Sequence, residues 1–408
     1  MHVVLFEDQG HFDLLPFTYT RPAFALRAGI YLNQERWAAV MDAAIHTLAY
    51  AYLGPRYTHL PTEGECLWIN GRYWPESELL RFCDQLPPNS YARHHQYPEV
   101  AVARFARERL PDDHDGLITV AWCEAQGLRA ETFALDVRAF RFPEDFFLLN
   151  REAIAFDFNL VTETQQSREL VDPHTVVYGK ENLFVSPGVR SYAAIINAED
   201  GPVYLGAGVE IGEGAIIHGS HALGDHCRVS MGAKLRGDSA FGPFVKVGGE
   251  VGNSVIMGYS NKGHEGYLGN SVLGYWCNLG ADTNTSNLKN NYAEVKLYHE
   301  PSGRFRATGQ QFCGLMMGDH SKCGINTMFN TGTVVGVSAN LFGAGYPRPF
   351  VPSFAWGGAH GLSTFRLDKA CEVAERVMGR RHLPFDDEER AILAAVYEQT
   401  AAQRRWER

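Results

Sequence analysis

The hydrophobic pattern of the chain changes near residue 205. From there every sixth residue is large and apolar over a long stretch: Leu205, Ile211, Ile217, Leu223, Val229, Leu235, Phe241 and Val247. Glycine often follows these positions, and the fourth residue after each is usually small or β-branched. A six-residue period of this kind predicts a hexapeptide β-helix, in which three short strands form one triangular coil around stacked apolar side chains.

The six-residue period is interrupted twice. It lapses near Asn253, resumes at Leu273, and after a second break returns at Met317, Cys323, Phe329, Val335 and Leu341. The first gap holds GYSNKGHEGYLG (residues 258–269), and NLGADTNTSNLKNNY (278–292) leads into the second. Segments that leave a solenoid usually serve function or assembly, so we expect the working residues of this half in these two places.

The first 170 residues follow another pattern. The apolar runs VVLF, CLWIN and LITVAW alternate with segments of helical spacing, such as the one around Gln34 to Tyr50. This alternation predicts an α/β domain with a mostly parallel sheet. At the other end, residues 366–380 and 386–408 have amphipathic helical spacing, which predicts a helical cap on the solenoid.

The expected division is therefore an α/β domain in residues 1–170, a linker or first coil in 171–204, a β-helix in 205–350 and a helical segment in 351–408. Composition agrees with a soluble enzyme-sized chain: 408 residues, 45% hydrophobic and 21% charged. No window approaches the ~20 unbroken apolar residues of a membrane helix. The start, MHVVLFEDQG, lacks the features of a secretory signal.

Net charge limits the classes of binding partner, and cysteine content indicates the redox compartment. The formal net charge of -10 argues against general nucleic-acid binding, so any phosphate site must be local. Eight scattered cysteines without a CxxC pair predict free thiols in a reducing compartment. We therefore expect a cytoplasmic protein with small-molecule substrates and neither nucleic-acid nor membrane partners.

His264 is the histidine of the first gap, close to Lys262, Glu265 and Tyr267. An imidazole with an ordinary pKa near ~6.5 can accept a proton at neutral pH, so His264 is a candidate general base. The alternative is a histidine that only hydrogen-bonds its turn. A metal-ligand interpretation is weaker because no second histidine or thiolate lies at ligand spacing.

The motifs KGHEGYLG and NLGADTNTSN resemble the acetyltransferase domain of the bifunctional bacterial enzyme that makes UDP-N-acetylglucosamine. There a histidine loop reads like AGHLTYLG and precedes NIGAGTITCN by the same interval. The resemblance is closer still to the divergent branch found largely in Bacteroidetes, the bifunctional UDP-N-acetylglucosamine diphosphorylase/glucosamine-1-phosphate N-acetyltransferase type, and it covers essentially the whole chain. It implies a left-handed β-helix and a homotrimer.

Carried over by position, the resemblance implies that His264 deprotonates the amine of glucosamine 1-phosphate as it attacks acetyl-CoA. Tyr267 and Asn278 would hold the sugar phosphate, and the backbone of Gly280 and Ala281 would lie beside the thioester. The family's phosphate-binding arginine and lysine are replaced by Ser230 and Gly248. Arg228, Lys246, Lys262 and Lys289 are the available substitutes.

In the N-terminal domain, the frame LLPFTYTRP resembles the sugar nucleotidyltransferases, but the glycines of their phosphate loop are missing. Arg21 and Arg27 are candidate nucleotide-binding residues because guanidinium groups bind phosphate in a bidentate manner. Asn70 and Gly71 in CLWINGRYW correspond to the family's Asn-Gly-Asp, with Arg72 in place of the metal-binding aspartate. Asp157, Glu7 or Asp8 would then have to hold Mg²⁺.

The expected activity is acetyl transfer from acetyl-CoA to glucosamine 1-phosphate, followed by Mg²⁺-dependent uridylyl transfer from UTP. Two alternatives remain. One is a nucleotidyltransferase for UTP or dTTP whose β-helix serves only assembly. The other is a non-catalytic sugar-nucleotide-binding regulator, which the lost glycine loop and Arg72 favour.

Overall fold

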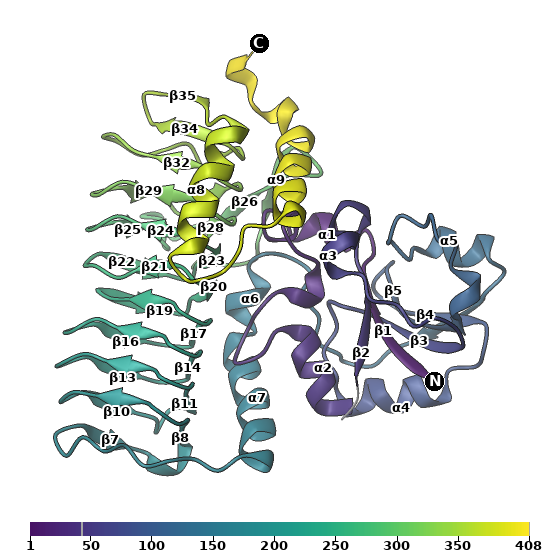
Figure 1. Cartoon of the computed structure of the whole chain (residues 1–408), viewed down its shortest axis with the longest axis horizontal. Helices are drawn as coiled ribbons and strands as arrows, with labels where there is room; N and C mark the ends of the chain where they lie inside the picture. Colours follow the sequence, from purple (N-terminus) through teal and green to yellow (C-terminus); the bar gives the residue numbers. More distant parts are fainter. Residues whose placement is uncertain (42–43, 408) are drawn as a thin grey trace. The chain divides into compact units, whose positions relative to one another are not determined.

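The computed structural model describes residues 1–41 and 44–407, which form two compact units. The first comprises Met1–Leu26 and Tyr31–Phe142, and the second comprises Arg27–Ile30 and Pro143–Arg408. Figure 1 shows a sheet with short helices in the first unit and a stack of strands with long helices in the second. None of the helices in the described ranges has the length and apolar content that crossing a membrane requires.

The first unit contains a sheet of order β2-β1-β3-β5-β4-β6, in which β5 runs against its two neighbours and the remaining pairs are parallel. The expected α/β domain with a mostly parallel sheet is confirmed. Its strands are β1 (His2–Phe6), β2 (Ile45–Leu48), β3 (Glu65–Asn70), β4 (Ser90–His94), β5 (Val100–Ala106) and β6 (Arg129–Phe133). Its helices are α1 (Gly10–Asp13), α2 (Asn33–Met41), α3 (Gly54–Tyr57), α4 (Ser77–Gln85) and α5 (Val120–Ala125).

Two expectations for this unit were wrong in detail. The run LITVAW is not a strand, because the side chain of Thr119 accepts a hydrogen bond from Trp122 N and so begins helix α5. The helical segment expected around Gln34 to Tyr50 ends as α2 at Met41, and strand β2 follows. Residues 42 and 43 of that segment lie outside the described residues.

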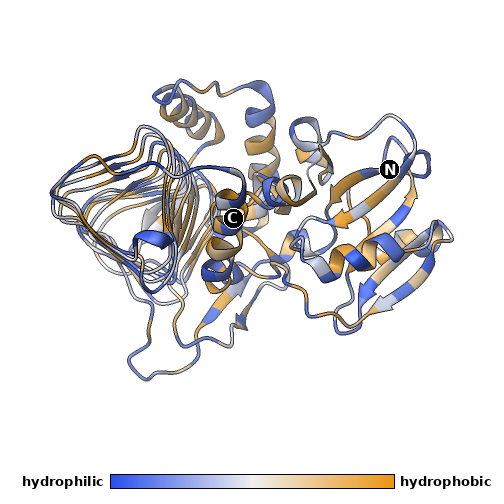
Figure 2. Cartoon of the chain, turned by 90° about the horizontal axis from the view of Figure 1, so that it is seen from below, coloured by the Kyte–Doolittle hydropathy of each residue, from blue (hydrophilic) through white to orange (hydrophobic). Residues whose placement is uncertain are grey.

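The second unit is a left-handed parallel β-helix, as expected, whose coils contribute one strand to each of three sheets. Figure 2 looks along the coils and shows their three-sided outline. The first sheet contains β7 (Val176–Tyr178), β10 (Ile195–Asn197), β13 (Ile216–His218), β16 (Lys234–Arg236), β19 (Glu250–Gly252) and β22 (Tyr267–Gly269). The pair β25 (Asn284–Thr285) and β30 (Met328–Phe329) forms a separate two-stranded sheet.

The other two sheets run through the whole stack. One contains β8 (Leu183–Val185), β11 (Val203–Leu205), β14 (His221–Leu223), β17 (Ser239–Phe241), β20 (Val255–Gly258), β23 (Val272–Tyr275), β28 (Met316–Met317), β31 (Val334–Val335) and β33 (Phe350–Val351). The other contains β9 (Arg190–Ser191), β12 (Glu210–Ile211), β15 (Arg228–Val229), β18 (Lys246–Val247), β21 (Asn261–Lys262), β24 (Asn278–Leu279), β29 (Lys322–Cys323), β32 (Asn340–Leu341), β34 (Ala355–Gly358) and β35 (Gly361–Thr364).

The interior of the solenoid confirms the six-residue pattern. All eight apolar positions from Leu205 to Val247 are buried in one continuous core. The coils begin upstream of that pattern, since β7 to β11 lie within residues 176–205. In the second break the chain leaves the stack as an antiparallel hairpin, β26 (Lys296–His299) and β27 (Arg304–Ala307).

Helices α6 (Asp145–Leu148) and α7 (Asn150–Thr164) belong to the second unit, although the sequence division assigned them to the N-terminal domain. Asn150 Nδ2 donates to Asp238 O at 2.9 Å, which ties α7 to the coils. Helices α8 (Leu367–Gly379) and α9 (Asp387–Gln399) lie along one side of the later coils (Figure 1). The chain end reaches β35, where Trp406 Nε1 donates to Thr364 Oγ1 at 2.8 Å.

Candidate active site

A groove of about 1000 Å³ lies on the β-helix unit. Successive strands of the β15-β18-β21-β24-β29 row form its floor, and the end of α8 forms one wall. His264, Asn278, Gly280 and Ala281 line it. One groove therefore brings together four of the residues that the sequence analysis singled out.

His264 lies in the turn between β21 and β22, and its side chain is exposed to the groove. Within the described residues, its ring makes no hydrogen bond to its own turn or to any other protein group. The alternative of a histidine that satisfies its turn therefore has no support in the geometry. An exposed imidazole in a ligand-sized groove is able to accept a proton from a bound molecule.

Asn278 begins β24, next to Asn261 of β21, whose Nδ2 donates to Asn278 Oδ1 at 3.3 Å. Gly280 follows that strand, and a Cβ there would come within 2.4 Å of the Gly324 carbonyl carbon. Glycine is required because the next coil approaches so closely. The result is a bare backbone segment at Gly280 and Ala281 beside the polar Asn278 side chain.

Lys262 does not face the groove, contrary to the predicted phosphate contact. It pairs with Val247 on the preceding coil and is 1% exposed, so its side chain occupies the interior position of its coil. Its Nζ donates to His264 O at 2.5 Å, Gly248 O at 3.2 Å and Glu265 O at 3.3 Å. Burial lowers the pKa of Lys262 from 10.5 to about 8. Lys262 therefore holds the backbone of the histidine turn from inside the solenoid.

Tyr267 and Lys289 are also outside the groove lining. The Tyr267 hydroxyl accepts a hydrogen bond from Asn287 Nδ2 at 3.0 Å and lies on the β22 face of the solenoid. Lys289 Nζ donates to Glu294 O at 2.6 Å near the base of the hairpin arm. A single chain thus assembles only part of the predicted substrate site.

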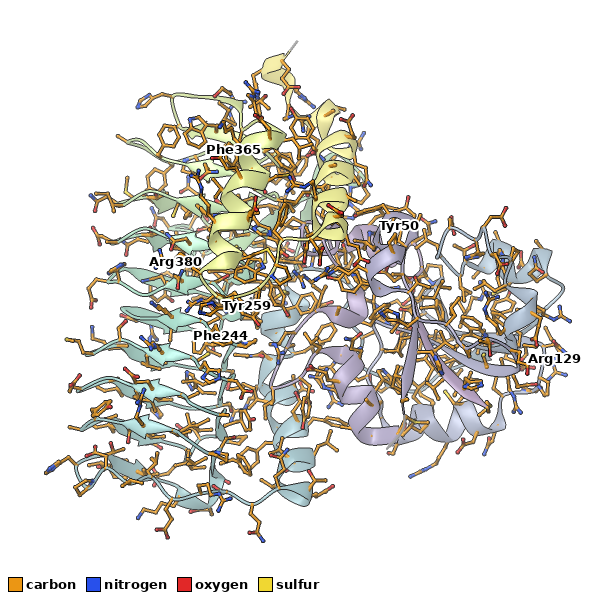
Figure 3. All side chains as sticks on the ribbon, viewed as in Figure 1. Tyr50, Arg129, Phe244, Tyr259, Phe365 and Arg380 are labelled. Carbon is orange, nitrogen blue, oxygen red and sulfur yellow. The ribbon has the colours of Figure 1, made fainter. Side chains whose placement is uncertain are left out.

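Two arginines and a row of aromatic residues at the groove were not expected from the sequence. Arg380 and Arg381 follow α8 and line the groove opposite Arg228 and Lys246. Phe244, Tyr259 and Trp276 stack along one corner of successive coils, with ring centroids 5.3 and 4.4 Å apart. Figure 3 shows Phe244 and Tyr259 next to each other near the end of α8 that carries Arg380. The two adjacent arginines are the signal in the sequence, but the amphipathic spacing before them predicts only a helical cap.

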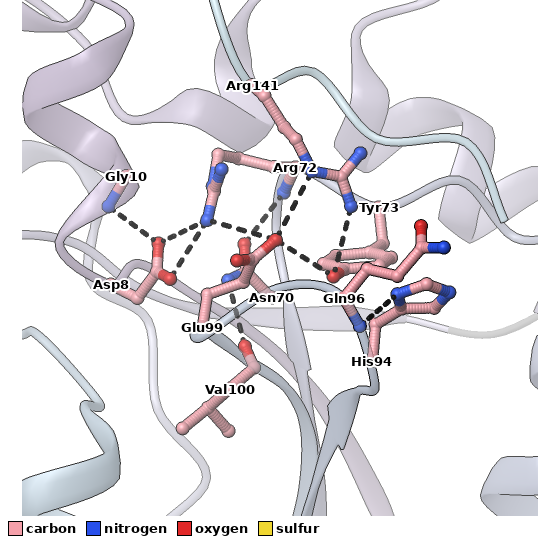
Figure 4. A network of polar contacts seen from close by, with 10 residues as sticks. All are labelled: Asp8, Gly10, Asn70, Arg72, Tyr73, His94, Gln96, Glu99, Val100 and Arg141. Atoms are coloured by element: carbon pink, nitrogen blue, oxygen red, sulfur yellow. Dashed lines mark hydrogen bonds and ion pairs between the residues drawn. The ribbon is translucent and has the colours of Figure 1, made fainter. Parts of the chain in front are cut away.

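The first unit has a buried polar network at the carboxyl edge of its sheet, shown in Figure 4. In α/β sheets, ligands bind beyond this edge where the strand order reverses, and here the order reverses at β1. Arg72 Nη2 donates to both carboxylate oxygens of Asp8, each at 2.9 Å, and lies 4.0 Å from Glu99. Burial alone would lower the pKa of Arg72, but the charges of Asp8 and Glu99 raise it. Burial raises the pKa of Asp8, although the charge of Arg72 opposes that shift.

Asn70 and Gly71, which were predicted to bind nucleotide, make their contacts within the protein. Asn70 Nδ2 donates to Val100 O at 2.9 Å, and Asn70 Oδ1 accepts from Arg72 N at 3.1 Å. Gly71 packs against Phe24, since a Cβ there would lie 2.8 Å from the Phe24 Cβ. These contacts argue against direct nucleotide contacts by the Asn70 side chain.

The two arginines predicted to bind nucleotide belong to different units. Arg27 is in the second unit, where its Nη1 donates to Ile30 O, and its contact with nucleotide stays a prediction. Arg21 is half-buried and stays in the first unit. Its segment is tied to the end of β1, because Ala23 N donates to Glu7 Oε1 at 2.9 Å. Arg21 therefore remains a candidate.

The residues suggested for Mg²⁺ do not fit a metal. Asp157 is fully buried within α7 of the second unit, where its Oδ2 accepts from Ile30 N at 2.9 Å, so this assignment was wrong. Asp8 is bound by Arg72, and the carboxylate of Glu7 accepts from Ala23 N and Tyr50 N. The described residues hold no cluster of three or more metal-ligating side chains.

Comparison with known proteins agrees with this architecture. Residues 3–166 match the family model described as sugar nucleotidyl transferase. The bifunctional protein GlmU of Rippkaea orientalis is 32% identical over 127 residues, 27% of this chain and 27% of its own length. GlmU of Bartonella quintana is 23% identical over 257 residues, 60% of this chain and 52% of its own length. A bifunctional sugar-1-phosphate nucleotidylyltransferase/acetyltransferase of Sulfurisphaera tokodaii is 34% identical over 93 residues, 23% of each chain.

The chain thus spans between about a quarter and a half of the length of these curated relatives. Among solved structures, the polySia-specific acetyltransferase NeuO aligns over 51% of this chain and 95% of its own, with 15% identity and a TM-score of 0.28. Arabidopsis UDP-N-acetylglucosamine acyltransferase aligns over 58% and 94%, with 17% identity and a TM-score of 0.24. These scores are too low to support a functional assignment. The sequence matches identify the chain as a transferase with a sugar nucleotidyltransferase-type domain.

Proposed function

We propose that the β-helix groove transfers an acetyl group from acetyl-CoA to the amine of glucosamine 1-phosphate. The observation that carries this proposal is the unpartnered imidazole of His264, exposed in a groove with Asn278 and the bare backbone at Gly280 and Ala281. An ammonium group is not nucleophilic until a base removes its proton. The ring of His264 accepts a proton from the amine as its nitrogen attacks the thioester carbonyl. The C–S bond then breaks, and the protonated ring returns the proton to the departing thiolate, so that CoA leaves as the thiol.

The test is His264→Ala in the full-length chain. Acetyl transfer should fall by about 10²-fold or more, as is typical for loss of a general base. The melting temperature should stay within a few degrees of wild type, because the exposed ring contributes little packing. A variant that loses folding in proportion to activity would contradict the catalytic role. His226→Ala is the matched control, since it removes another exposed histidine of the same solenoid.

For the α/β unit we propose uridylyl transfer from UTP to N-acetylglucosamine 1-phosphate in the cytoplasm, in line with the family match at residues 3–166. Membership of the divergent branch found largely in Bacteroidetes is part of this proposal. One observation favours a second candidate, sugar-nucleotide binding without transfer. Arg72 neutralises Asp8 at the edge where ligands bind in such sheets. Pyrophosphate release from UTP and N-acetylglucosamine 1-phosphate separates the two, because a binding unit releases none.

We also propose a homotrimer, supported by an apolar patch on one outer face of the solenoid. Val176, Ile195 and Ile216 are lateral neighbours on β7, β10 and β13, and they are 44%, 39% and 41% exposed. Exposed apolar patches of this kind often mark interfaces. Tyr267 lies further along the same sheet, so in such an assembly it would face a partner. Ile195→Asp should convert the trimer to monomers in light scattering; an unchanged mass would contradict this interface.

A further inference from the structure

We propose that Arg228, Lys246, Arg380 and Arg381 form a phosphate-binding cluster in the groove, which holds the phosphate of one of the two reactants. The inference rests on the proposed acyl transfer and deepens it. The two phosphate sources are the acceptor sugar 1-phosphate and the phosphates of acetyl-CoA. Both present the same chemistry to the protein.

The four cations come from two different parts of the second unit. Arg228 and Lys246 are directly paired neighbours at the starts of β15 and β18, so their side chains leave adjacent coils. Arg380 and Arg381 follow the last residue of α8, and all four line the same groove. Figure 3 shows the end of α8 next to the coils that carry Phe244 and Tyr259. The docking of α8 along the coils thus completes the cluster.

The cations perturb one another. Burial lowers the pKa of Lys246, and the charges of Arg381, Arg228 and Arg380 lower it further. Burial also lowers the pKa of Arg381, with added effects of Arg228 and Arg380. None of the four forms an ion pair within the described residues, and Arg381 donates from Nη2 to Phe244 O at 3.4 Å. Like charges gathered without counter-charges are stabilised by an anion.

The two acidic residues of the groove form no ion pair with this cluster within the described residues, although Glu210 is the ladder neighbour of Arg228. Glu210 is bound to Arg190, with its Oε2 2.7 Å from Arg190 Nη2, and Glu213 is exposed. The negative end of a helix dipole accounts for a basic residue at the end of α8. It does not account for Arg228 and Lys246, which stand on separate coils.

The other candidate phosphate-binding positions are either uncharged or engaged in contacts within the protein. The positions at which the family resemblance places cations hold Ser230 and Gly248. Ser230 Oγ donates to Gly263 O at 2.8 Å, so it is committed to the histidine turn. Lys262 occupies an interior position of the solenoid and donates to His264 O, and Lys289 Nζ donates to Glu294 O just before the hairpin. Of the four substitutes suggested by sequence, Arg228 and Lys246 line the groove.

The test is calorimetric titration of the full-length double variant Arg380→Gln/Arg381→Gln with acetyl-CoA and with glucosamine 1-phosphate, separately. We expect at least one ligand to bind about tenfold or more weakly than to wild type, because each lost charge-assisted hydrogen bond contributes of that order. The ligand whose affinity falls identifies the phosphate source. Arg376→Gln is the matched control, since Arg376 lies on α8, is exposed and pairs with Glu372.

Inorganic pyrophosphate is the third titrant, and it tests the cluster without any acetyl transfer. Wild type and His264→Ala should both bind it, and the double variant should bind it at least about tenfold more weakly. If the wild-type protein binds pyrophosphate but catalyses no acetyl transfer, the proposed acetyl transfer is overturned and the cluster is not. Wild-type affinity of the double variant for all three ligands, no pyrophosphate binding by wild type, or an equal loss in Arg376→Gln would overturn the cluster.

Discussion

Replacement of Lys262 by methionine should change how stability depends on pH. Methionine keeps an unbranched side chain in the interior position but removes the ammonium that donates to His264 O, Gly248 O and Glu265 O. In the folded chain burial lowers the pKa of Lys262 from 10.5 to about 8. The unfolded chain restores the ordinary value, so the two states titrate differently.

The sign and size follow from proton linkage. Below about pH 8 the lysine is protonated in both states and contributes no slope. Between about pH 8 and 10.5 the unfolded state binds one more proton, so the free energy of unfolding rises with pH. At about 1.4 kcal/mol per pH unit, the part of this interval up to pH 10 corresponds to roughly 2–3 kcal/mol of stabilisation. Wild type should gain this increment and Lys262→Met should not.

Urea unfolding of both proteins at pH 7.5 and pH 10 measures the difference. Lys234→Met is the matched control, because Lys234 is exposed on the same solenoid and should leave the wild-type slope unchanged. A Lys262→Met variant with the same pH dependence as wild type would refute the reasoning. The variant should also lower the rate of acetyl transfer about tenfold or more at neutral pH, since the His264 carbonyl loses its donor and small displacements at a reacting centre are costly.

Two further substitutions test the packing at the two candidate sites. Arg72→Met should destabilise the chain by about 3–5 kcal/mol in urea unfolding, because it leaves Asp8 buried without its ion-pair partner. Adding Asp8→Asn should recover part of that loss. An Arg72→Met variant with wild-type stability would rule out a stabilising ion pair. Gly280→Ala should cost about 1–3 kcal/mol and reduce acetyl transfer, because its Cβ would lie 2.4 Å from the Gly324 carbonyl carbon. Gly379→Ala meets nothing within 4 Å and should be near neutral; equal effects of the two changes would contradict the steric argument.

The fold could be predicted from the sequence because the solenoid repeats one local rule. From Leu205 to Val247 each interior residue follows the same six-residue spacing, so the sequence alone indicates the coil. The period lapsed at Asn253 for two physical reasons. Val247, Val251 and Ile256 are all interior but are separated by shortened turns, and the next interior position is Lys262. A charged residue inside a coil cannot be distinguished from a surface lysine by its pattern.

The site was predictable only where it depends on local sequence. The breaks in the six-residue period pointed to this part of the chain, and the family resemblance singled out His264, Asn278, Gly280 and Ala281, which line one groove. Arg380 and Arg381 reach the groove only because α8 runs back along the coils, which no short-range pattern indicates. Asp157 was suggested for Mg²⁺ only as a carboxylate, whereas the structure makes it a fully buried part of helix α7.

The central claim is that His264 acts as the base for acetyl transfer. Purified wild-type chain and His264→Ala should be incubated with acetyl-CoA and glucosamine 1-phosphate, with free CoA thiol and N-acetylglucosamine 1-phosphate measured together. We predict equal amounts of both products with wild type and a loss of about 10²-fold or more in the variant. Absence of both products with wild-type chain that still releases pyrophosphate from UTP and a sugar 1-phosphate would contradict the account.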